Sequence, residues 1–376
     1  MKFIHLFTLL LIVYSFTSCK KKNTPEPEPE PDVNGTVYVG SDDKNLYAIN
    51  ATTGLKKWAF ATDGAIFSSP SFVNGVVYVG SFDKKVYAVN AATGAKKWEF
   101  ATDGLIFSSP SIVNGVVYIG STDQKLYALD AATGAKKWEF AAEGSVDSSP
   151  MVVNGVVYVG CEGKKVYALD AVTGAKKWEF AMSGVSATTP TSPTFANGVV
   201  YACDFQRTLF AIDAATGAKK WQFKTEASID SSPTVKNGLV YITSFDFKLR
   251  ALDAATGTEK WQFEIGITGM SSPTVSNSVV YVGSIFGRMY AVDAITGLKK
   301  WQFITDDTNT APMYSSLTAA EGKIYACTGE KKLYALNAIT GTSDWVFQTE
   351  GLINSSPCVV TASGKVYHSG VSGAQE

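Results

Sequence analysis

The sequence has few of the residues that carry most enzyme chemistry and nucleic-acid recognition. Among 376 residues there are only two histidines, His5 and His368, and three arginines, and basic and acidic side chains nearly balance at 33 and 34. A protein that binds phosphates needs a positively charged face, so this balance argues against a general nucleic-acid binder. Two histidines that lie so far apart in the sequence also argue against a histidine-based metal centre or catalytic triad.

The apolar run from Phe3 to Phe16 is too short to span a bilayer. Its 14 residues fall below the roughly 20 that a membrane-spanning helix needs, and they suit the core of a signal peptide that begins after Lys2. The small pair Thr17-Ser18 before Cys19 resembles the cleavage site of bacterial lipoproteins. That resemblance implies a signal peptide over residues 1–18 and acylation of Cys19; a plain secreted protein is the alternative.

Residues 19–33 are rich in proline and glutamate. Alternating Pro and Glu neither form a helix nor pair in a sheet, so we expect an extended polyproline II tether. At about 3.1 Å per residue it would hold the folded part roughly 40 Å from a membrane. The mature protein is therefore expected outside the cytoplasm.

Tryptophan is periodic. The spacings between successive tryptophans are 40, 40, 40, 43, 40, 40 and 44 residues, which indicates eight copies of one unit. Each unit has four short β-type runs, and in the second unit these are SSPSFV, GVVYVGS, KVYAVN and KKWEF. The tryptophans are Trp58, Trp98, Trp138, Trp178, Trp221, Trp261, Trp301 and Trp345.

Four strands in each 40-residue repeat predict an all-β fold, an eight-bladed β-propeller with four-stranded antiparallel blades. The first unit lacks the SSP strand, which reappears after the last tryptophan as NSSPCVV from Asn354. We expect this segment to be the innermost strand of the first blade and to close the ring. The propeller should span residues 34–362, leaving 363–376 as a tail or a short extra strand.

Every unit contains the phrase Ala-x-Asp/Asn-x-x-Thr-Gly-x-x-x-Trp, as in Ala128 to Trp138. The carboxylate or amide starts a tight turn, the glycine takes a left-handed conformation, and the indole covers the turn. This phrase closely resembles the docking motif of the PQQ-like (quinoprotein-type) β-propeller family. The resemblance implies that each indole packs toward the neighbouring blade, so we interpret the tryptophans as structural joints rather than as a ligand site.

The resemblance also raises the question of a quinone cofactor. Quinoprotein dehydrogenases of this family are known for a calcium ion, an aspartate base, adjacent cysteines and a tryptophan beneath the quinone. Here Cys161, Cys203, Cys327 and Cys358 lie in separate units, and all eight tryptophans are already docking residues. We therefore expect no cofactor, no metal and no catalytic residues. The four cysteines are expected to be small buried residues, with a disulfide between neighbouring blades as the alternative.

The units differ most at loops expected around one mouth of the channel. Just before SSP or its equivalent stand Phe67, Phe107, Asp147, Pro190, Asp230, Met270, Tyr314 and Asn354. Both insertions, from Ser186 and from Asp306, flank units five to seven, which also carry aromatic and arginine residues in their loops. Such residues on a rigid scaffold are typical of binding surfaces. The hypothesised partner surface is Phe205, Arg207, Asp230, Phe245, Phe247, Arg250, Phe286, Arg288 and Tyr314; drift near the insertions, with Arg250 paired to Asp230 or another acid, is the alternative.

The leading hypothesis is a non-catalytic, lipid-anchored and monomeric scaffold of the bacterial cell envelope that binds envelope proteins. In anchor, size and blade number the chain resembles the propeller lipoprotein of the outer-membrane β-barrel assembly machinery, which implies an outer-membrane location facing the periplasm or the cell surface. One alternative is an oxidoreductase using PQQ and calcium. Another is a glycan- or peptide-binding module with Phe67, Phe107 and Tyr314 as stacking platforms and Asp147 and Asp230 as acceptors.

Overall fold

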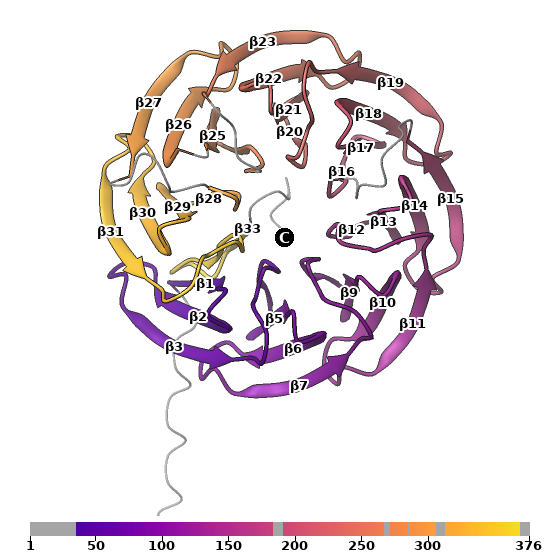
Figure 1. Ribbon diagram of the computed structural model, residues 1–376, viewed down its shortest axis with the longest axis vertical. Helices are drawn as coiled ribbons and strands as arrows, with labels where there is room; N and C mark the ends of the chain where they lie inside the picture. Colours follow the sequence, from indigo (N-terminus) through magenta and orange to yellow (C-terminus); the bar gives the residue numbers. More distant parts are fainter. Residues whose placement is uncertain (1–34, 183–190, 267–270, 285, 306–312, 369–376) are drawn as a thin grey trace, which may run out of the picture. The chain divides into compact units, whose positions relative to one another are not determined.

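A computed structural model describes residues 35–182, 191–266, 271–284, 286–305 and 313–368. The chain divides into Met1–Pro31, which lies wholly outside these ranges, and Asp32–Glu376. The described residues of the second unit form eight antiparallel sheets arranged as a closed ring (Figure 1). No helix in the described ranges is long and apolar enough to cross a membrane.

The strands follow the repeats. The first sheet holds β1 (Thr36–Gly40), β2 (Asn45–Asn50), β3 (Lys56–Ala61), β32 (Cys358–Val360) and β33 (Val366–His368). The second and third sheets hold β4 (Ser71–Val73), β5 (Val76–Gly80), β6 (Lys85–Asn90), β7 (Lys96–Ala101), and β8 (Ser111–Val113), β9 (Val116–Gly120), β10 (Lys125–Asp130), β11 (Lys136–Ala141). The fourth and fifth hold β12 (Met151–Val153), β13 (Val156–Cys161), β14 (Lys165–Asp170), β15 (Lys176–Ala181), and β16 (Thr194–Ala196), β17 (Val199–Cys203), β18 (Thr208–Asp213), β19 (Lys219–Lys224).

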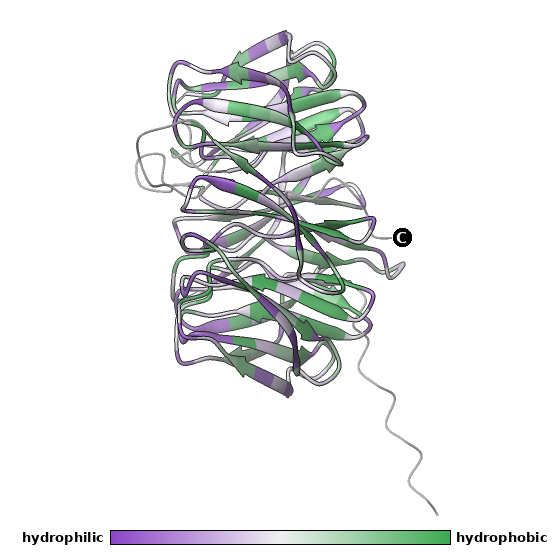
Figure 2. Cartoon of the chain, turned by 90° about the vertical axis from the view of Figure 1, so that its right-hand side faces the viewer, coloured by the Kyte–Doolittle hydropathy of each residue, from purple (hydrophilic) through white to green (hydrophobic). Residues whose placement is uncertain are grey.

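The last three sheets continue the pattern. They hold β20 (Thr234–Lys236), β21 (Leu239–Ser244), β22 (Lys248–Asp253), β23 (Glu259–Glu264); β24 (Thr274–Ser276), β25 (Val279–Gly283), β26 (Arg288–Asp293), β27 (Lys299–Ile304); and β28 (Thr318–Ala320), β29 (Lys323–Thr328), β30 (Lys332–Asn337), β31 (Ser343–Gln348). In Figure 2, seen from the side, hydrophobic residues run along the strands and many connecting turns are hydrophilic.

The ring closes as predicted, because the C-terminal strand β32 pairs with β1. Thr36 lies opposite Val360 and Tyr38 opposite Cys358, so the first blade receives its inner strand from the other end of the chain. The first blade differs from its sisters in one respect. Strand β33 pairs with β32, with Cys358 opposite His368, and makes this sheet five-stranded.

Each blade is joined to the next by its tryptophan. The indole N–H of Trp98 donates to the carbonyl of Ala131 at 2.9 Å, across the blade boundary. Gly134 has φ +75°, and a Cβ built there would lie 2.8 Å from the Trp98 ring, so the turn needs glycine for its conformation and for the indole. The Asp130 carboxylate starts this turn by accepting the N–H groups of Ala132 and Thr133, both at 3.1 Å. The interpretation of the phrase as a structural joint therefore agrees with its geometry.

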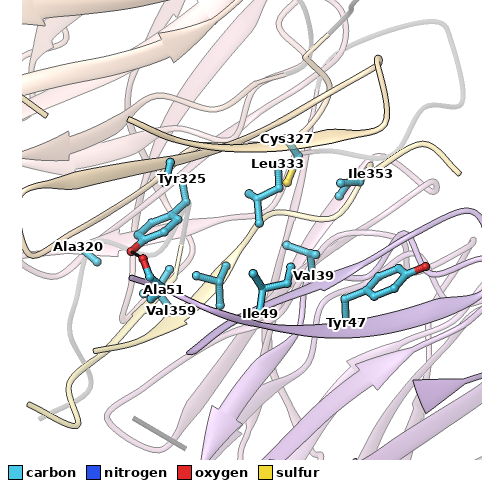
Figure 3. Packing of buried hydrophobic residues seen from close by; sticks show 12 residues of the cluster. Val39, Tyr47, Ile49, Ala51, Ala320, Tyr325, Cys327, Leu333, Ile353 and Val359 are labelled. Atoms are coloured by element: carbon cyan, nitrogen blue, oxygen red, sulfur yellow. Dashed lines mark hydrogen bonds between the residues drawn. The ribbon is translucent and has the colours of Figure 1, made fainter. Parts of the chain in front are cut away.

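The hydrophobic core lies between blades rather than in one centre. At the junction of the last and first blades, Val39 and Ile49 face Leu333, and Tyr325 donates a hydrogen bond to the carbonyl of Ala51 (Figure 3). Cys327 belongs to the same cluster. All four propeller cysteines (Cys161, Cys203, Cys327 and Cys358) are buried and free of disulfides, as small core residues.

Candidate functional site

The two faces of the ring carry different connections. One face, here called the loop face, carries the loops between the second and third strands of the repeat and the connections from one blade to the next. The opposite face, the turn face, carries the Asn-Gly turns and the Thr-Gly turns of the docking phrase. The loop face is the candidate site because sister repeats differ most there in sequence.

Three consecutive blades place their aromatic and arginine residues on the loop face. Phe205 and Arg207 come from the β17–β18 loop, and Phe247 from the β21–β22 loop; Phe205 and Phe247 are 38% and 45% exposed. Arg288 begins β26 and is exposed, and Tyr314, 42% exposed, precedes β28. Phe245 and Phe286 are partly buried on the same face. The two insertions lie largely outside the described residues.

Arg250 does not contribute to this exposed surface. It is 4% exposed and pairs with Asp246, with Nη2 to Oδ2 at 2.7 Å, and with Glu259, with Nε to Oε2 at 3.2 Å. Burial alone would raise the pKa of the Asp246 carboxyl, but the Arg250 hydrogen bond and charge hold it below its usual value. The alternative, an arginine paired with an acid, thus describes Arg250, and its partner is Asp246 rather than Asp230.

Asp230 lies at the mouth of the channel in the connection that leads to β20. Its Oδ2 is buried and has no hydrogen-bond partner among the described residues. Burial raises the pKa of this carboxyl to about 6. The connection itself is fixed, because Ser231 Oγ donates to the Thr243 carbonyl at 3.0 Å and Phe245 N–H donates to the Ser228 carbonyl at 2.9 Å. A carboxylate oxygen that is buried without a hydrogen-bond partner costs stability when the group is ionised, which makes Asp230 a candidate for contact with a ligand or partner.

We expect Asp230→Asn to stabilise the protein at pH 8. The folded-state pKa of about 6 lies above the ordinary aspartate value of 3.8, so ionisation above pH 6 costs folding free energy. Allowing for the partial exposure of Asp230, the gain should be about 1–2 kcal/mol and should shrink as the pH falls from 6 toward 4. Urea denaturation at pH 8, 6 and 4 measures it.

An amide fits this position, since Asn354 occupies it in the first blade and donates to Asp42 Oδ1 at 3.2 Å. A less stable Asn variant at pH 8 would show that the Asp230 carboxylate is stabilised in the native state.

A second aromatic group lies elsewhere on the loop face. The Phe67 and Phe82 rings stack with centroids 4.5 Å apart, and Phe107 meets Phe82 edge-on at 4.5 Å. Phe107 is 38% exposed. These three aromatic rings pack against one another, so only part of their surface is open to a ligand.

A closed ring of serine side chains lines the channel. The second serine of each SSP or equivalent segment accepts, through Oγ, the backbone N–H of the corresponding serine in the preceding blade, at 2.9–3.1 Å. The eight serines are Ser69, Ser109, Ser149, Ser192, Ser232, Ser272, Ser316 and Ser356. They line a central cavity of about 240 Å³ together with proline rings and His368.

His368 fills a gap in a second ring of hydrogen bonds. In five blades a hydroxyl at the start of the innermost strand donates to a carbonyl of the next blade, as from Thr318 to Pro357 at 2.7 Å; the five donors are Ser71, Thr194, Thr234, Thr274 and Thr318. The first blade has Cys358 at this position, and the His368 imidazole on β33 bonds the Pro70 carbonyl. Burial lowers the pKa of His368 to about 4, so its imidazole is neutral at physiological pH.

The residues of the channel do not fit a quinone with calcium. Serine and proline side chains dominate the lining, and the described residues contain no group of three or more His, Cys, Asp or Glu able to hold a metal. The indoles that could form a quinone floor are the blade joints, each with its N–H bonded to the next blade.

The fold and the channel define a closed eight-bladed propeller with tryptophan-docked blades. A family model described as outer membrane protein assembly factor BamB matches residues 25–106, 102–204, 187–266 and 248–374, and the chain belongs to this family. A search of curated proteins gave no match.

Solved structures share the fold at low identity. BamB from Moraxella catarrhalis has a TM-score of 0.67 and 20% identity, covering 80% of this chain and 95% of its own. The computationally designed Ika8 protein has a TM-score of 0.68 and 12% identity, and the match covers 80% of this chain and 95% of the designed chain. A europium-containing methanol dehydrogenase has a TM-score of 0.69 and 15% identity, and the match covers 83% of this chain and 84% of the dehydrogenase chain. The likeness extends to an assembly factor, a designed protein and an enzyme, so the fold alone does not assign an activity.

Proposed function

We propose that this chain is a non-catalytic scaffold of the bacterial cell envelope, anchored through acylated Cys19, that binds an envelope protein during outer-membrane protein assembly. The family description as an outer membrane protein assembly factor supports this role. The observation that carries the binding surface is Asp230 at the channel mouth, whose buried Oδ2 has no hydrogen-bond partner among the described residues. It lies beside loops with exposed Phe205, Arg207 and Phe247.

The chemistry of this surface suits a protein partner. Exposed aromatic rings supply apolar contact area, and Arg207 and Arg288 supply planar donors for carboxylates. A lysine, an arginine or a backbone N–H of the partner would satisfy Asp230 Oδ2, offsetting the cost of its burial. We refer to Phe205, Arg207, Asp230, Phe245, Phe247, Phe286, Arg288 and Tyr314 as the partner surface.

We expect the double variant Arg207→Glu with Arg288→Glu to abolish capture of the envelope partner. Reversing two charges at an interface replaces attraction by repulsion and should weaken binding at least about 100-fold. Crosslinking and pull-down from intact envelopes, followed by mass spectrometry, measures the loss and names the partner.

The matched control is Lys84→Glu, because Lys84 occupies in the second blade the loop position that Arg207 has in the fifth. Lys84 and Arg207 also share a left-handed backbone, with φ of 70° and 80°. Equal capture by the wild type and by the double variant would remove the partner surface from consideration.

A glycan- or peptide-binding module is the second candidate, and the aromatic group of Phe67, Phe82 and Phe107 is the observation that favours it. Sugar rings stack on exposed aromatic faces, and Phe107 offers such a face. A glycan array with Phe107→Ala as control tests this role. Binding that survives this substitution would locate the ligand elsewhere.

A further inference from the structure

An exposed aliphatic cluster lies on the turn face, away from the partner surface. Four of the five most exposed large hydrophobic side chains in the described residues are Leu55, Ile295, Leu298 and Ile339, at 69%, 73%, 69% and 85% exposure. They occupy the β2–β3, β26–β27 and β30–β31 turns. The blade of β28–β31 stands between the other two in the ring, so the three turns are neighbours (Figure 1). We call these four residues the aliphatic rim.

The turn itself does not require large side chains at these positions. Isolated exposed hydrophobic residues are common on protein surfaces, but these recur on three adjacent blades. At the positions of Ile295 and Ile339 the sister blades carry Thr52, Ala92, Ala132, Val172, Ala215 and Ala255. At the positions of Leu55 and Leu298 they carry Ala95, Ala135, Ala175, Ala218, Thr258 and Thr342. The same turn therefore forms with alanine or threonine.

The rim is held rigidly by the blade joints. Gly54, Gly297 and Gly341, in the three turns, have φ between +72° and +74°. A Cβ at any of them would lie 2.7–2.8 Å from the docking indole of the preceding blade. The aliphatic side chains consequently project from fixed turns as separate points.

Positive charge accompanies the rim in two of its three blades. Lys56 and Lys299 directly follow Leu55 and Leu298 and are exposed. In three sister blades the corresponding lysine pairs with a glutamate three residues later, at 2.6–2.8 Å: Lys96–Glu99, Lys136–Glu139 and Lys176–Glu179. In the first and seventh blades that glutamate is replaced by Ala59 and Gln302, which carry no charge, and the eighth blade has Ser343 in place of the lysine. Lys56 and Lys299 thus lack the compensating glutamate of these three sister blades.

The chain also enters the ring next to the rim. The Gly35 carbonyl accepts the N–H of Ala51 at 2.8 Å, at the base of the turn that carries Leu55. Gly35 is the first described residue of the ring.

We propose that the aliphatic rim docks on the surface of an anionic lipid bilayer. Aliphatic side chains enter the boundary between headgroups and acyl chains, while adjacent lysines contact anionic headgroups. Separate projecting points suit a deformable lipid surface, whereas a protein interface needs a continuous closely packed area. The inference rests on the proposed function only in placing the ring beside a membrane.

Single labelled cysteines test the proposal in the full chain. The four propeller cysteines are buried, so in a Cys19→Ser background an introduced surface cysteine is the accessible thiol of the ring. Ile339→Cys and Leu298→Cys would carry the environment-sensitive fluorophore NBD. The matched control is Val172→Cys, at the Ile339 position of the fourth blade and 82% exposed.

With vesicles of phosphatidylethanolamine and phosphatidylglycerol, NBD emission at residues 298 and 339 should rise and shift to shorter wavelength, and emission at residue 172 should not. An equal response at all three sites, or no response at 298 and 339, would overturn the proposal. A response to added unlabelled protein without vesicles would assign the rim to a second copy of the chain and would also overturn it. Mass spectrometry of residue 19 in the wild type tests the lipid anchor separately, because the labelled proteins lack that cysteine.

A second variant replaces the rim by residues that the sister turns already use. Leu55→Ala, Ile295→Ala, Leu298→Ala and Ile339→Ala together should lower the vesicle-bound fraction of the Cys19→Ser chain about tenfold without changing its thermal midpoint. Unchanged binding by this variant contradicts a role for the rim.

Discussion

Arg250→Ala should destabilise the propeller by about 3–5 kcal/mol, because it leaves the Asp246 carboxylate buried without its cation. Both side chains are almost fully buried, at 4% and 5% exposure, and Arg250 Nη1 also donates to Ser244 Oγ and to Asp246 Oδ1, each at 2.9 Å. Removing the guanidinium therefore breaks several hydrogen bonds at once. Urea denaturation followed by near-ultraviolet circular dichroism measures the change.

The sister blades supply the matched rescue, Arg250→Tyr. In the second blade Tyr87 occupies the equivalent position and donates to Asp83 Oδ2 at 2.8 Å, and Tyr127 donates to Asp123 in the same way. We expect the Tyr variant to recover most of the loss, since its hydroxyl satisfies one Asp246 oxygen. An alanine variant within about 1 kcal/mol of the wild type would show that water replaces the arginine.

Trp98→Ala should lower the free energy of unfolding by about 3–5 kcal/mol, the range expected when a large buried aromatic side chain is truncated. Trp98 is 9% exposed, lies against Gly134 of the next blade and meets Tyr78 with ring centroids 5.8 Å apart. Its loss leaves a cavity between two blades and removes one of the two hydrogen bonds to the Ala131 carbonyl, which keeps its bond from the Tyr78 hydroxyl at 3.0 Å. Chemical denaturation measures the effect.

Trp98→Phe is the companion variant, since it keeps a ring over Gly134 and removes only the N–H and part of the area. Trp98→Phe should lower the free energy of unfolding clearly less than Trp98→Ala. A negligible effect of Trp98→Ala would mean that the repeated phrase does not hold the blades together and would reopen the question of a ligand role.

The architecture was predictable because its determinants are local and occur eight times. Asp130, Gly134 and Trp98 illustrate this: a carboxylate that starts a turn, a left-handed glycine and an indole each act within or beside one turn. The closure of the ring by β32 followed from counting strands. For the segment that forms β33 the sequence predicts only a tail or an extra strand, because a four-stranded blade has no vacant place for it.

The interior of the channel was not predictable from the sequence. Ser69 and Ser109 are 40 residues apart, and their hydrogen bond depends on the radius at which the ring closes. The partner of Arg250 was missed although a signal existed. Sister repeats place an acid four residues before the tyrosine, as in Asp83 and Tyr87, and Asp246 keeps that spacing to Arg250. The partner surface itself remains a prediction, because its determinants lie in the loops where the repeats diverge.

The hydrogen bonds around the channel form a loop without a first or last member. Ser356 N–H bonds Ser69 Oγ at 2.9 Å across the junction of the chain's two ends, as Ser69 N–H bonds Ser109 at 2.9 Å inside the chain. Trp345 likewise bonds Ala51 across the same junction. The last and first blades are thus held together by the same hydrogen bonds as any other neighbouring pair, although the two ends of the chain meet there. The chain of the propeller could equally begin at another connection between blades. A circular permutant that opens a different connection between blades and joins residue 368 to residue 35 through a flexible linker should preserve the same ring.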